Sequence, residues 1–325
     1  MARKWLLSVL VGTLACAGIA GAQSFPTRPI RAVVPYAAGG LPDTMTRIAS
    51  QRMIEILGQQ IVVDNRPGAG GISGCELVAN AAPDGYTLLI ADVAQTAINP
   101  ALFAKLPYDT LRDFAPVSLM GTSGQFLVAH ATVPANTLKE LIALARSKPG
   151  QLRYGSGGIG SVHHLSMEAL KTPLKLDIVH VPYKGAGQAV PALLAGEVSL
   201  LFAALPSIAP HVKAGRLKLL GVNTLKRNAQ APDVPTIGEL TGIKDYDYPP
   251  AIGVMAPAKT PKAVINQLAA AVQKAMRHPD TVARYTTLGI DPVGNTPEQY
   301  LAQTRADITK YARAVKASGV KVDGN

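Results

Sequence analysis

From Arg28 onward, short apolar runs alternate with longer segments of helical periodicity. The first apolar runs are IRAVVPY, QQIVVDN and YTLLIAD, and the helical segments between them are TMTRIASQRMIEIL and ISGCELVANAA. This alternation indicates a parallel sheet covered by helices. A second set follows, with LRY, DIVHVPY and VSLLFAA as apolar runs and with helices expected from Ser161 and from Gln188. The pattern therefore predicts two α/β units.

Two further segments are expected to carry the chain between these units. FAPVSLMGTSGQFLVAH contains two strand-like runs joined by Gly121 to Gly124, and KLLGVNTLKR would carry the chain back. The predicted fold class is α/β with two lobes, each a mainly parallel sheet flanked by helices, and with hinge strands between the lobes. We expect residues 23–123 to form the first part of lobe 1, residues 124–223 to form lobe 2, and residues 224–325 to return to lobe 1.

The segment after the return contains a Pro-rich connector (APDVPTIGEL), a strand (AIGVMAPAKTP) and two helices. The helices are expected from about Pro261 to Arg277 and from about Pro297 to Ala317. Thr260 and Thr296 each precede a Pro in the first turn, so both are predicted to cap a helix. The pattern does not assign these C-terminal helices to a lobe.

The N-terminus reads MARKWLLSVLVGTLACAGIAGAQ, with two cations, an apolar run and small residues at its end. These are the features of a cleaved secretory signal, and we expect removal of residues 1–22 and export to the periplasm. A membrane anchor is the competing interpretation. Lipid attachment at Cys16 is a second alternative.

Charge and cysteine content narrow the class of protein. The formal net charge is +11 and aromatic residues make up 5% of the chain, but the cations are scattered and form no aromatic-rich basic stripe. We therefore expect no nucleic-acid partner, although the charge would attract anionic solutes. Cys75 would be the only cysteine of the mature chain, so no internal disulfide is expected.

The stretch YGSGGIGSVHHL contains the pattern G-x-G-x-x-G at Gly155, Gly157 and Gly160. A dinucleotide site also needs an acid at the end of the next strand, whereas Asp177 stands at the beginning of DIVHVPY. The glycines instead indicate backbone N–H groups exposed at a helix N-terminus, where the helix dipole favours an anion. Hydroxyl groups of the serines at positions 156 and 161 would add donors.

A similar turn occurs earlier, where IRAVVPY runs into AAGGLPD and a helix. Gly39, Gly40 and the capping candidate Asp43 lie at this second strand-to-helix turn. Tight turns without a ligand are the alternative explanation for either glycine pair. One such turn in each lobe predicts a cleft that holds both ends of a small anion.

The sequence patterns of hydrolases, metal-binding proteins and interaction proteins are weaker in this chain. The nucleophile pattern G-x-S-x-G of secreted α/β hydrolases is absent, since Gly71-Ile72-Ser73-Gly74 is followed by Cys75. His164 and Glu168 are spaced for one helix face, but H-E-x-x-H and C-x-x-C are absent, so no metal site is expected. We predict no enzyme activity and no cofactor. An interaction protein without a small ligand would not require the paired glycine turns.

These segments resemble the periplasmic receptors of tripartite tricarboxylate transporters, the Bug family. The matching stretches cover nearly the whole mature chain and are RPIRAVVPYAAGGLPD, VVDNRPGAGGISG, APDGYTLLI, INPALFAKLPYDTLRDFAPVSLM, NTLKELIALARSKPGQLRYGSGGIGSVHHL, VHVPYKGAGQAVPALLAGEV and KAGRLKLLGVNTLKRNAQAPDVPTI. The resemblance implies a type II periplasmic-binding-protein fold that closes on a carboxylate through backbone amides, hydroxyls and water. It also implies a monomer that delivers its ligand to integral membrane transporter subunits.

The resemblance assigns ligand contacts in both lobes. In lobe 1 it indicates the loop from Tyr36 to Asp43, in which Gly39, Gly40 and Leu41 would offer backbone groups and Asp43 would order the loop or a water. In lobe 2 and elsewhere it indicates Ser156, Gly157, Gly160, Ser161, Tyr183, Lys184 and, after the strand of DGYTLLI, Thr96.

Ala203 is a further candidate ligand contact. The sequence departs from the family pattern at positions 41, 199 and 203. Leu41 stands where the family often has Thr or Ser, and Ser199 and Ala203 stand where it often has Asp. These changes favour a ligand that is larger or more apolar than a simple C4 dicarboxylate, with other di- and tricarboxylates and aromatic carboxylates as candidates. Delivery to a transporter is the expected output, and input to a two-component sensor is the alternative.

Overall fold

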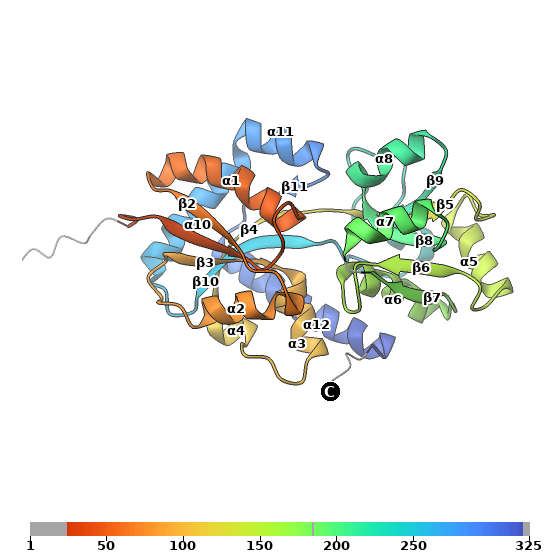
Figure 1. Cartoon of the computed structure of the whole chain (residues 1–325), viewed down its shortest axis with the longest axis horizontal. Coiled ribbons are helices and arrows are strands. Elements are labelled where there is room, and N and C mark those ends of the chain that lie inside the picture. Colours follow the sequence, from red (N-terminus) through yellow and green to blue (C-terminus); the bar gives the residue numbers. More distant parts are fainter. Residues whose placement is uncertain (1–24, 184, 321–325) are drawn as a thin grey trace, which may run out of the picture.

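Figure 1 shows two lobes arranged along the long axis of the computed structural model, which describes residues 25–183 and 185–320. Each lobe is a β-sheet flanked by helices. The predicted fold class, a two-lobed α/β protein, is confirmed. The expected signal peptide at residues 1–22 and the candidate Lys184 lie outside the described residues.

The sheet of lobe 1 contains β1 (Ile30–Val34), β2 (Ile61–Asn65), β3 (Thr87–Asp92), β4 (Phe114–Thr122), β10 (Ala251–Pro257) and β11 (Asp291–Pro292). In the described residues the strand order is β11-β4-β10-β3-β1-β2. β1 pairs in parallel with β2 and β3, whereas β10 runs antiparallel to β3 and β4. The central strands are continuous apolar runs because helices cover both faces of the sheet.

The sheet of lobe 2 contains β5 (Gln125–His130), β6 (Arg153–Ser156), β7 (Val179–Pro182), β8 (Leu200–Ala204) and β9 (Leu217–Val222). Within the described part of the chain its order is β7-β6-β8-β5-β9. β6 pairs in parallel with β7 and β8, and β5 runs antiparallel to β8 and β9. Both sheets are therefore mixed, with most strands sharing one direction.

The helices of lobe 1 are α1 (Leu41–Leu57), α2 (Ile72–Ala79), α3 (Asn99–Leu102), α4 (Thr110–Asp113), α10 (Lys262–Arg277), α11 (Pro279–Thr287) and α12 (Pro297–Ser318), with a π-helical turn, η2 (Ala94–Ile98). The helices of lobe 2 are α5 (Leu138–Ser147), α6 (Val162–Leu174), α7 (Ala186–Leu194), α8 (Leu205–Lys213) and α9 (Ile237–Thr241). The sequence analysis did not predict α3, α4, α5, α8, α9 or α11. The short length of α3, α4 and α9 and the prolines of α8 and α11 obscure the helical period there.

The chain passes between the lobes at two places. The first passage is the junction of β4 and β5, as the glycines between residues 121 and 124 predicted. The return does not occur at KLLGVNTLKR, because β9 pairs with β5 and the following Ile237 and Tyr246 are buried in the core of lobe 2. The chain enters lobe 1 only with β10, so the return lies near residue 250 rather than at residue 224.

Helix α12 contacts both lobes. It packs against β4 and η2 of lobe 1 and against α6 of lobe 2. Tyr311 of α12 and Leu165 of α6 belong to one buried cluster. In addition, Lys310 Nζ donates to the carbonyl of Asp247, 2.7 Å away, in the segment that returns to lobe 1. This helix therefore connects lobe 1 both to α6 of lobe 2 and to the segment around Asp247, through which the chain returns.

The two predicted Thr caps have different outcomes. Thr296 caps α12, since its hydroxyl accepts from the backbone N–H of Gln299 and the Gln299 side chain accepts from the Thr296 N–H. Thr260 does not cap α10, because Pro261 is the residue that precedes the helix. The Thr260 hydroxyl is buried and has no hydrogen-bond partner. The sequence signature was therefore correct at position 296 and wrong at position 260.

This difference predicts opposite effects of two isosteric substitutions. Thr296→Val should lower the free energy of unfolding by about 0.5 to 2 kcal/mol, because the cap of α12 is lost. Thr260→Val should be neutral or stabilising, because it removes a hydroxyl that is buried without a partner. Urea unfolding of both variants gives the comparison, and equal destabilisation by the two would contradict the assignment of the caps.

Candidate functional site

The first predicted site is the loop between β1 and α1. Gly39 has φ 81°, a left-handed conformation that favours glycine. Gly40 precedes the helix, and its N–H donates to the carbonyl of Ala37 at 3.2 Å. The N–H of Gly39 donates to Asp43 Oδ2 at 2.8 Å. Both glycine amides are therefore engaged within the loop, and the first helical amide, that of Leu41, has no acceptor inside α1.

Asp43 holds this loop in place. Its side chain is almost fully buried, Arg47 Nε donates to both of its oxygens at 3.0 Å, and Asn65 Nδ2 donates to Oδ1 at 3.0 Å. Burial alone would raise the pKa of Asp43, but the hydrogen bonds from Arg47, Gly39 and Asn65 hold that pKa below its usual value. The carboxylate is thus ionised and committed to ordering the loop.

A buried polar cluster supports the same loop from below. Tyr36 Oη donates to Asp92 Oδ2 at 3.2 Å and accepts from Gln95 Nε2 at 3.0 Å. Gln95 Oε1 in turn accepts from the N–H of Asp92 at 3.1 Å. Burial raises the pKa of Asp92 to about 6. The sequence analysis missed Asp92 and Gln95, although polar residues directly after the buried run TLLIA were a usable signal.

Thr96 contributes to the packing around this cluster. Its hydroxyl donates to the carbonyl of Asp92 at 3.2 Å, and its carbonyl accepts from the Thr110 hydroxyl at 2.9 Å. The side chain is 5% exposed. Its hydroxyl is therefore used to stabilise η2.

The second predicted site is the loop between β6 and α6. Ser156 is fully buried, and its hydroxyl donates to the carbonyl of Gly158 at 3.0 Å and accepts from the N–H of Gly158 at 3.1 Å. The N–H of Gly160 donates to His164 Nδ1 at 3.0 Å. As in lobe 1, internal hydrogen bonds use part of the donor set that the glycine pattern suggested. Gly157 lies between these anchored positions.

Donors remain at the beginning of α6. The hydroxyl oxygen of Ser161 accepts from the N–H of His164 at 3.3 Å, which leaves the hydroxyl proton available. Val162 and His163 are the first two residues of the helix, so their amides have no acceptor within it. These three groups can bind a carboxylate together, with support from the helix dipole. The sequence identified Ser161 but not the two amides.

Of the remaining positions, Tyr183 borders this loop, since its N–H donates to the Ser156 carbonyl at 3.1 Å. Tyr183 faces Gly155, and its hydroxyl donates to Glu197 at 3.4 Å. Ala203 is 3% exposed and is packed in the core of lobe 2. The hydroxyl of Ser199 accepts from the N–H of Arg153, at the far end of β6 from the loop. The inference about ligand size drawn from position 199 therefore loses its structural basis.

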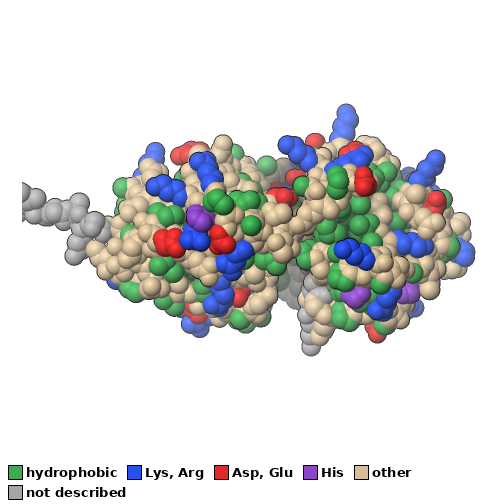
Figure 2. Space-filling view, turned by 90° about the horizontal axis from the view of Figure 1, so that it is seen from above, with side chains coloured by type: hydrophobic (Ala, Val, Ile, Leu, Met, Phe, Trp, Pro, Cys, Tyr) green, Lys and Arg blue, Asp and Glu red, His purple; other side chains and the backbone are tan. Residues whose placement is uncertain are grey.

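The two loops belong to adjoining parts of the lobes. A Cβ atom at Gly160 would lie 2.2 Å from Leu102 Cδ1, so the lobe 2 loop packs on α3 of lobe 1. Helix α3 directly follows η2, which carries Gln95 of the cluster under Tyr36. Figure 2 shows the molecule narrowing where the lobes meet, with Lys and Arg side chains scattered over both lobes on this face.

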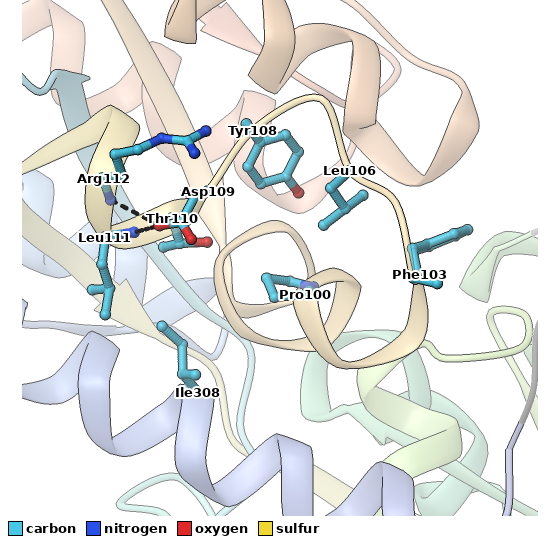
Figure 3. Close-up of a pocket in the computed structure, with 10 residues that line it drawn as sticks. Pro100, Phe103, Leu106, Tyr108, Asp109, Thr110, Leu111, Arg112 and Ile308 are labelled. Carbon is cyan, nitrogen blue, oxygen red and sulfur yellow. Dashed lines mark hydrogen bonds between the residues drawn. The ribbon is translucent and has the colours of Figure 1, made fainter.

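A separate cavity of about 380 Å³ lies on lobe 1 beside α4 and α12 (Figure 3). Phe103 and Ile308 supply apolar surface. Its acid is already engaged, since Asp109 Oδ1 accepts from the N–H groups of Leu111 at 2.9 Å and Arg112 at 2.8 Å. None of the predicted ligand residues lines this cavity. It is therefore distinct from the candidate site.

Metal binding and reactive-cysteine chemistry have little support in the described residues. They contain no group of three His, Cys, Asp or Glu side chains placed to hold a metal ion. Cys75 is fully buried, and burial raises the pKa of its thiol to about 12, which keeps it protonated and unreactive. Among residues 25–183 and 185–320, no helix combines the length and apolar character needed to cross a bilayer.

Two α/β lobes, each with a strand-to-helix turn whose first helical amides lack an intrahelical acceptor, are the arrangement of the class of two-lobed solute-binding proteins. The model of the tripartite tricarboxylate transporter family receptors matches residues 45–320. The chain belongs to this family, and the resemblance seen in the sequence is confirmed. It is similar to BugT of Bordetella pertussis (strain Tohama I), with 34% identity over 98% of this chain and 98% of that protein.

Further relatives and solved structures agree with this assignment. A UPF0065 protein of Pseudomonas sp. (strain P51), from the tcbD-tcbE intergenic region, is 40% identical over 90% of this chain and 87% of its own length. R. palustris Rpa4515 with adipate has a TM-score of 0.81 at 32% identity, covering 91% of this chain and 99% of that one. MatC of Rhodopseudomonas palustris with bound malate has a TM-score of 0.77 at 33% identity, covering 90% of this chain and all of that one.

Asp43→Asn tests the loop of lobe 1. The substitution should lower the free energy of unfolding by about 1 to 3 kcal/mol at neutral pH, because a charged acceptor of three donors is lost. Since the folded pKa of Asp43 lies below its unfolded value of about 4, its contribution exists above that pH and disappears as the pH falls. Urea unfolding across acidic pH should therefore show a weaker acid dependence in the variant.

Asp64→Asn is the matched control, because Asp64 also pairs with arginines and also has a lowered pKa but lies outside the loop. It should alter stability and leave carboxylate affinity unchanged. If Asp43→Asn is as stable as the wild type, Asp43 does not order the site. The same conclusion follows if Asp43→Asn and Asp64→Asn lose equal carboxylate affinity.

Proposed function

We propose that this protein is an exported periplasmic receptor that closes its lobes over a small organic carboxylate and passes it to integral membrane transporter subunits. The observation that carries this function is the pair of strand-to-helix turns, each rigidly held by its own hydrogen bonds and each followed by helix amides without intrahelical acceptors. Family membership and the adipate- and malate-bound relatives support the same conclusion.

Carboxylate binding at these turns requires no cationic side chain. In lobe 2 the carboxylate would accept from the Ser161 hydroxyl and from the amides of Val162 and His163. In lobe 1 it would accept from the amide of Leu41. Hydrogen bonds to an ionised acceptor are stronger than neutral ones, and they gain further strength when closure removes water. The ligand would bridge the lobes and shift an equilibrium between open and closed forms.

The proposed ligand also has an apolar body. The side chain of Ile159 is 50% exposed at the tip of the lobe 2 loop, and Leu41 is partly buried at the beginning of α1. Large apolar side chains at both turns favour a carboxylate with an aliphatic or aromatic spacer over a heavily hydroxylated one. No step in this function breaks a covalent bond, and the protein would act as a monomer without a cofactor.

A thermal-shift screen of the mature protein, refolded to remove carried ligand, tests the proposed ligand class. Adipate, benzoate, malate and citrate are suitable probes. A ligand at one hundred times its dissociation constant adds about 2.7 kcal/mol of stability, which raises the Tm by several degrees. We expect adipate or benzoate to exceed malate and citrate. A folded protein without a shift for any carboxylate would contradict the proposed function.

Ser161→Ala tests the donor set in lobe 2. It should weaken binding of the best probe by about 1 to 3 kcal/mol in calorimetric titration, because a hydroxyl that donates to a charged group is lost. Ser161 also caps α6, so Thr137→Ala is the control: Thr137 caps the remote helix α5 in the same way, through the N–H of Glu140. Equal affinities of the two variants would remove the Ser161 hydroxyl from the site.

A further inference from the structure

Two imidazole rings lie directly behind the lobe 2 loop. His164 comes from α6 and His180 from β7, and their rings stack with centroids 3.8 Å apart and planes 11° apart. The ring of Tyr154, from β6, stacks on His180 with centroids 4.8 Å apart. Three consecutive elements of lobe 2 therefore contribute one ring each to a stack at the base of the proposed carboxylate site.

His164 holds the last glycine of the loop. The Gly160 N–H donates to His164 Nδ1 at 3.0 Å, so this nitrogen is an acceptor and carries no proton. The ring proton of neutral His164 therefore lies on Nε2, which is 4.0 Å from Glu168 Oε1. Gly160 has φ 74°, a left-handed conformation that this hydrogen bond secures.

His180 holds the other glycine through a serine. His180 Nε2 lies 2.7 Å from Ser156 Oγ, and this hydroxyl is hydrogen-bonded to both the N–H and the carbonyl of Gly158. When the Ser156 hydroxyl donates to the Gly158 carbonyl, His180 Nε2–H donates to the Ser156 oxygen. Gly158 also has a positive φ, of 122°. Both left-handed glycines of the loop are thus fixed by the ring stack.

The charged groups that face the stack are Glu168 and Lys171 of α6. Glu168 Oε1 accepts from Tyr154 Oη at 2.6 Å and from Lys171 Nζ at 2.7 Å, so its charge is largely compensated. Burial, and secondarily Lys171, lowers the pKa of His164 to about 4. Burial and the neighbouring His164 lower the pKa of His180 to about 4, against an opposing effect of Glu168.

We propose that His164 and His180 are positioning residues that hold the carboxylate-binding loop as long as both rings are neutral, and that protonation of the stack releases the loop and the ligand. A proton on His164 Nδ1 would replace the acceptor of the Gly160 N–H with a second donor. Two positively charged rings in face-to-face contact would also repel each other. The ligand-binding part of this proposal rests on the proposed function of the loop.

Acid should therefore act on the folded protein in a definite direction. The folded pKa values lie below the unfolded value of about 6.5, so protonation favours the unfolded or loosened state. The stabilisation from these rings is complete above that pH and declines as the pH falls toward about 4. His163, the adjacent histidine on α6, also has a pKa lowered by burial to about 4, and it remains as a common background in the variants below.

Two classes of variant separate hydrogen bonding from packing. His164→Asn keeps an acceptor oxygen near the place of Nδ1, and His180→Gln keeps a donor near the place of Nε2, while neither replacement titrates. His164→Phe keeps an aromatic ring in the stack but removes the acceptor. A purely structural role of the stack would make the Phe variant the mildest of the three. A positioning role would make it the most damaging to affinity.

The first measurement uses adipate and isothermal titration of the mature protein. At neutral pH, His164→Phe should bind adipate at least about tenfold more weakly than His164→Asn, since the Gly160 N–H loses its acceptor only in the Phe variant. Between neutral pH and about pH 4, wild-type affinity should fall about tenfold more than that of the double variant His164→Asn/His180→Gln. Adipate itself titrates in this range, but its protonation affects both proteins equally and cancels in the ratio.

The second measurement needs no ligand. Amide hydrogen exchange of Gly158 and Gly160, followed by NMR on the unliganded mature protein, should show protection of both amides at neutral pH. The protection of Gly160, whose N–H donates to His164 Nδ1, should be lost in His164→Phe and retained in His164→Asn. Protected amides without binding of adipate, benzoate, malate or citrate at any pH would refute the carboxylate function and leave the loop-holding role intact. Unprotected amides, equal exchange in the Phe and Asn variants, or equal acid responses of wild type and double variant would overturn the proposal.

Discussion

The amides at the beginnings of α1 and α6 have no acceptors within their own helices. The polar side chains beside them are already used in other hydrogen bonds. The nearby polar groups that would compete for them are engaged elsewhere: Asp43 by Gly39 and Arg47, and Ser156 by Gly158. A helix end that is left unsatisfied is unfavourable unless water or a ligand binds there. In the proposed function, the affinity for a carboxylate would originate in the hydrogen bonds that these amides lack in the unliganded fold.

Such a site works only when its two halves are correctly placed, and this depends on parts of the chain far from it. The lobes are joined by two passages of backbone, which alone would leave their relative orientation poorly defined. Helix α12 adds a third connection, since it packs on η2 of lobe 1 and on α6 of lobe 2. The bond from Lys310 to the carbonyl of Asp247 extends this connection to the return passage. The last helix thus contacts the elements next to the two proposed ligand-binding turns, η2 in lobe 1 and α6 in lobe 2.

The fold was largely predictable from sequence because its main strands are apolar runs between strong turn signals. The return passage was misplaced because the Pro-rich segment after β9 contains the short helix α9, which buries Ile237 in lobe 2, and no local pattern reveals that destination. Within the candidate site, glycine spacing correctly located both turns. It could not show that the N–H groups of Gly39 and Gly160 are consumed by Asp43 and His164, because such bonds depend on side-chain placement in three dimensions.

Glycine at position 160 permits a left-handed backbone conformation, and it also allows close packing of the two lobes. A single methyl group there would lie 2.2 Å from Leu102 Cδ1 of the opposite lobe, well inside contact distance. The glycine is therefore a spacer of minimum thickness between two separately folded sheets. The size of the residue at position 160 therefore limits how closely the two lobes can approach each other at this point. In a receptor of this design, one sequence position sets the minimum distance between the lobes.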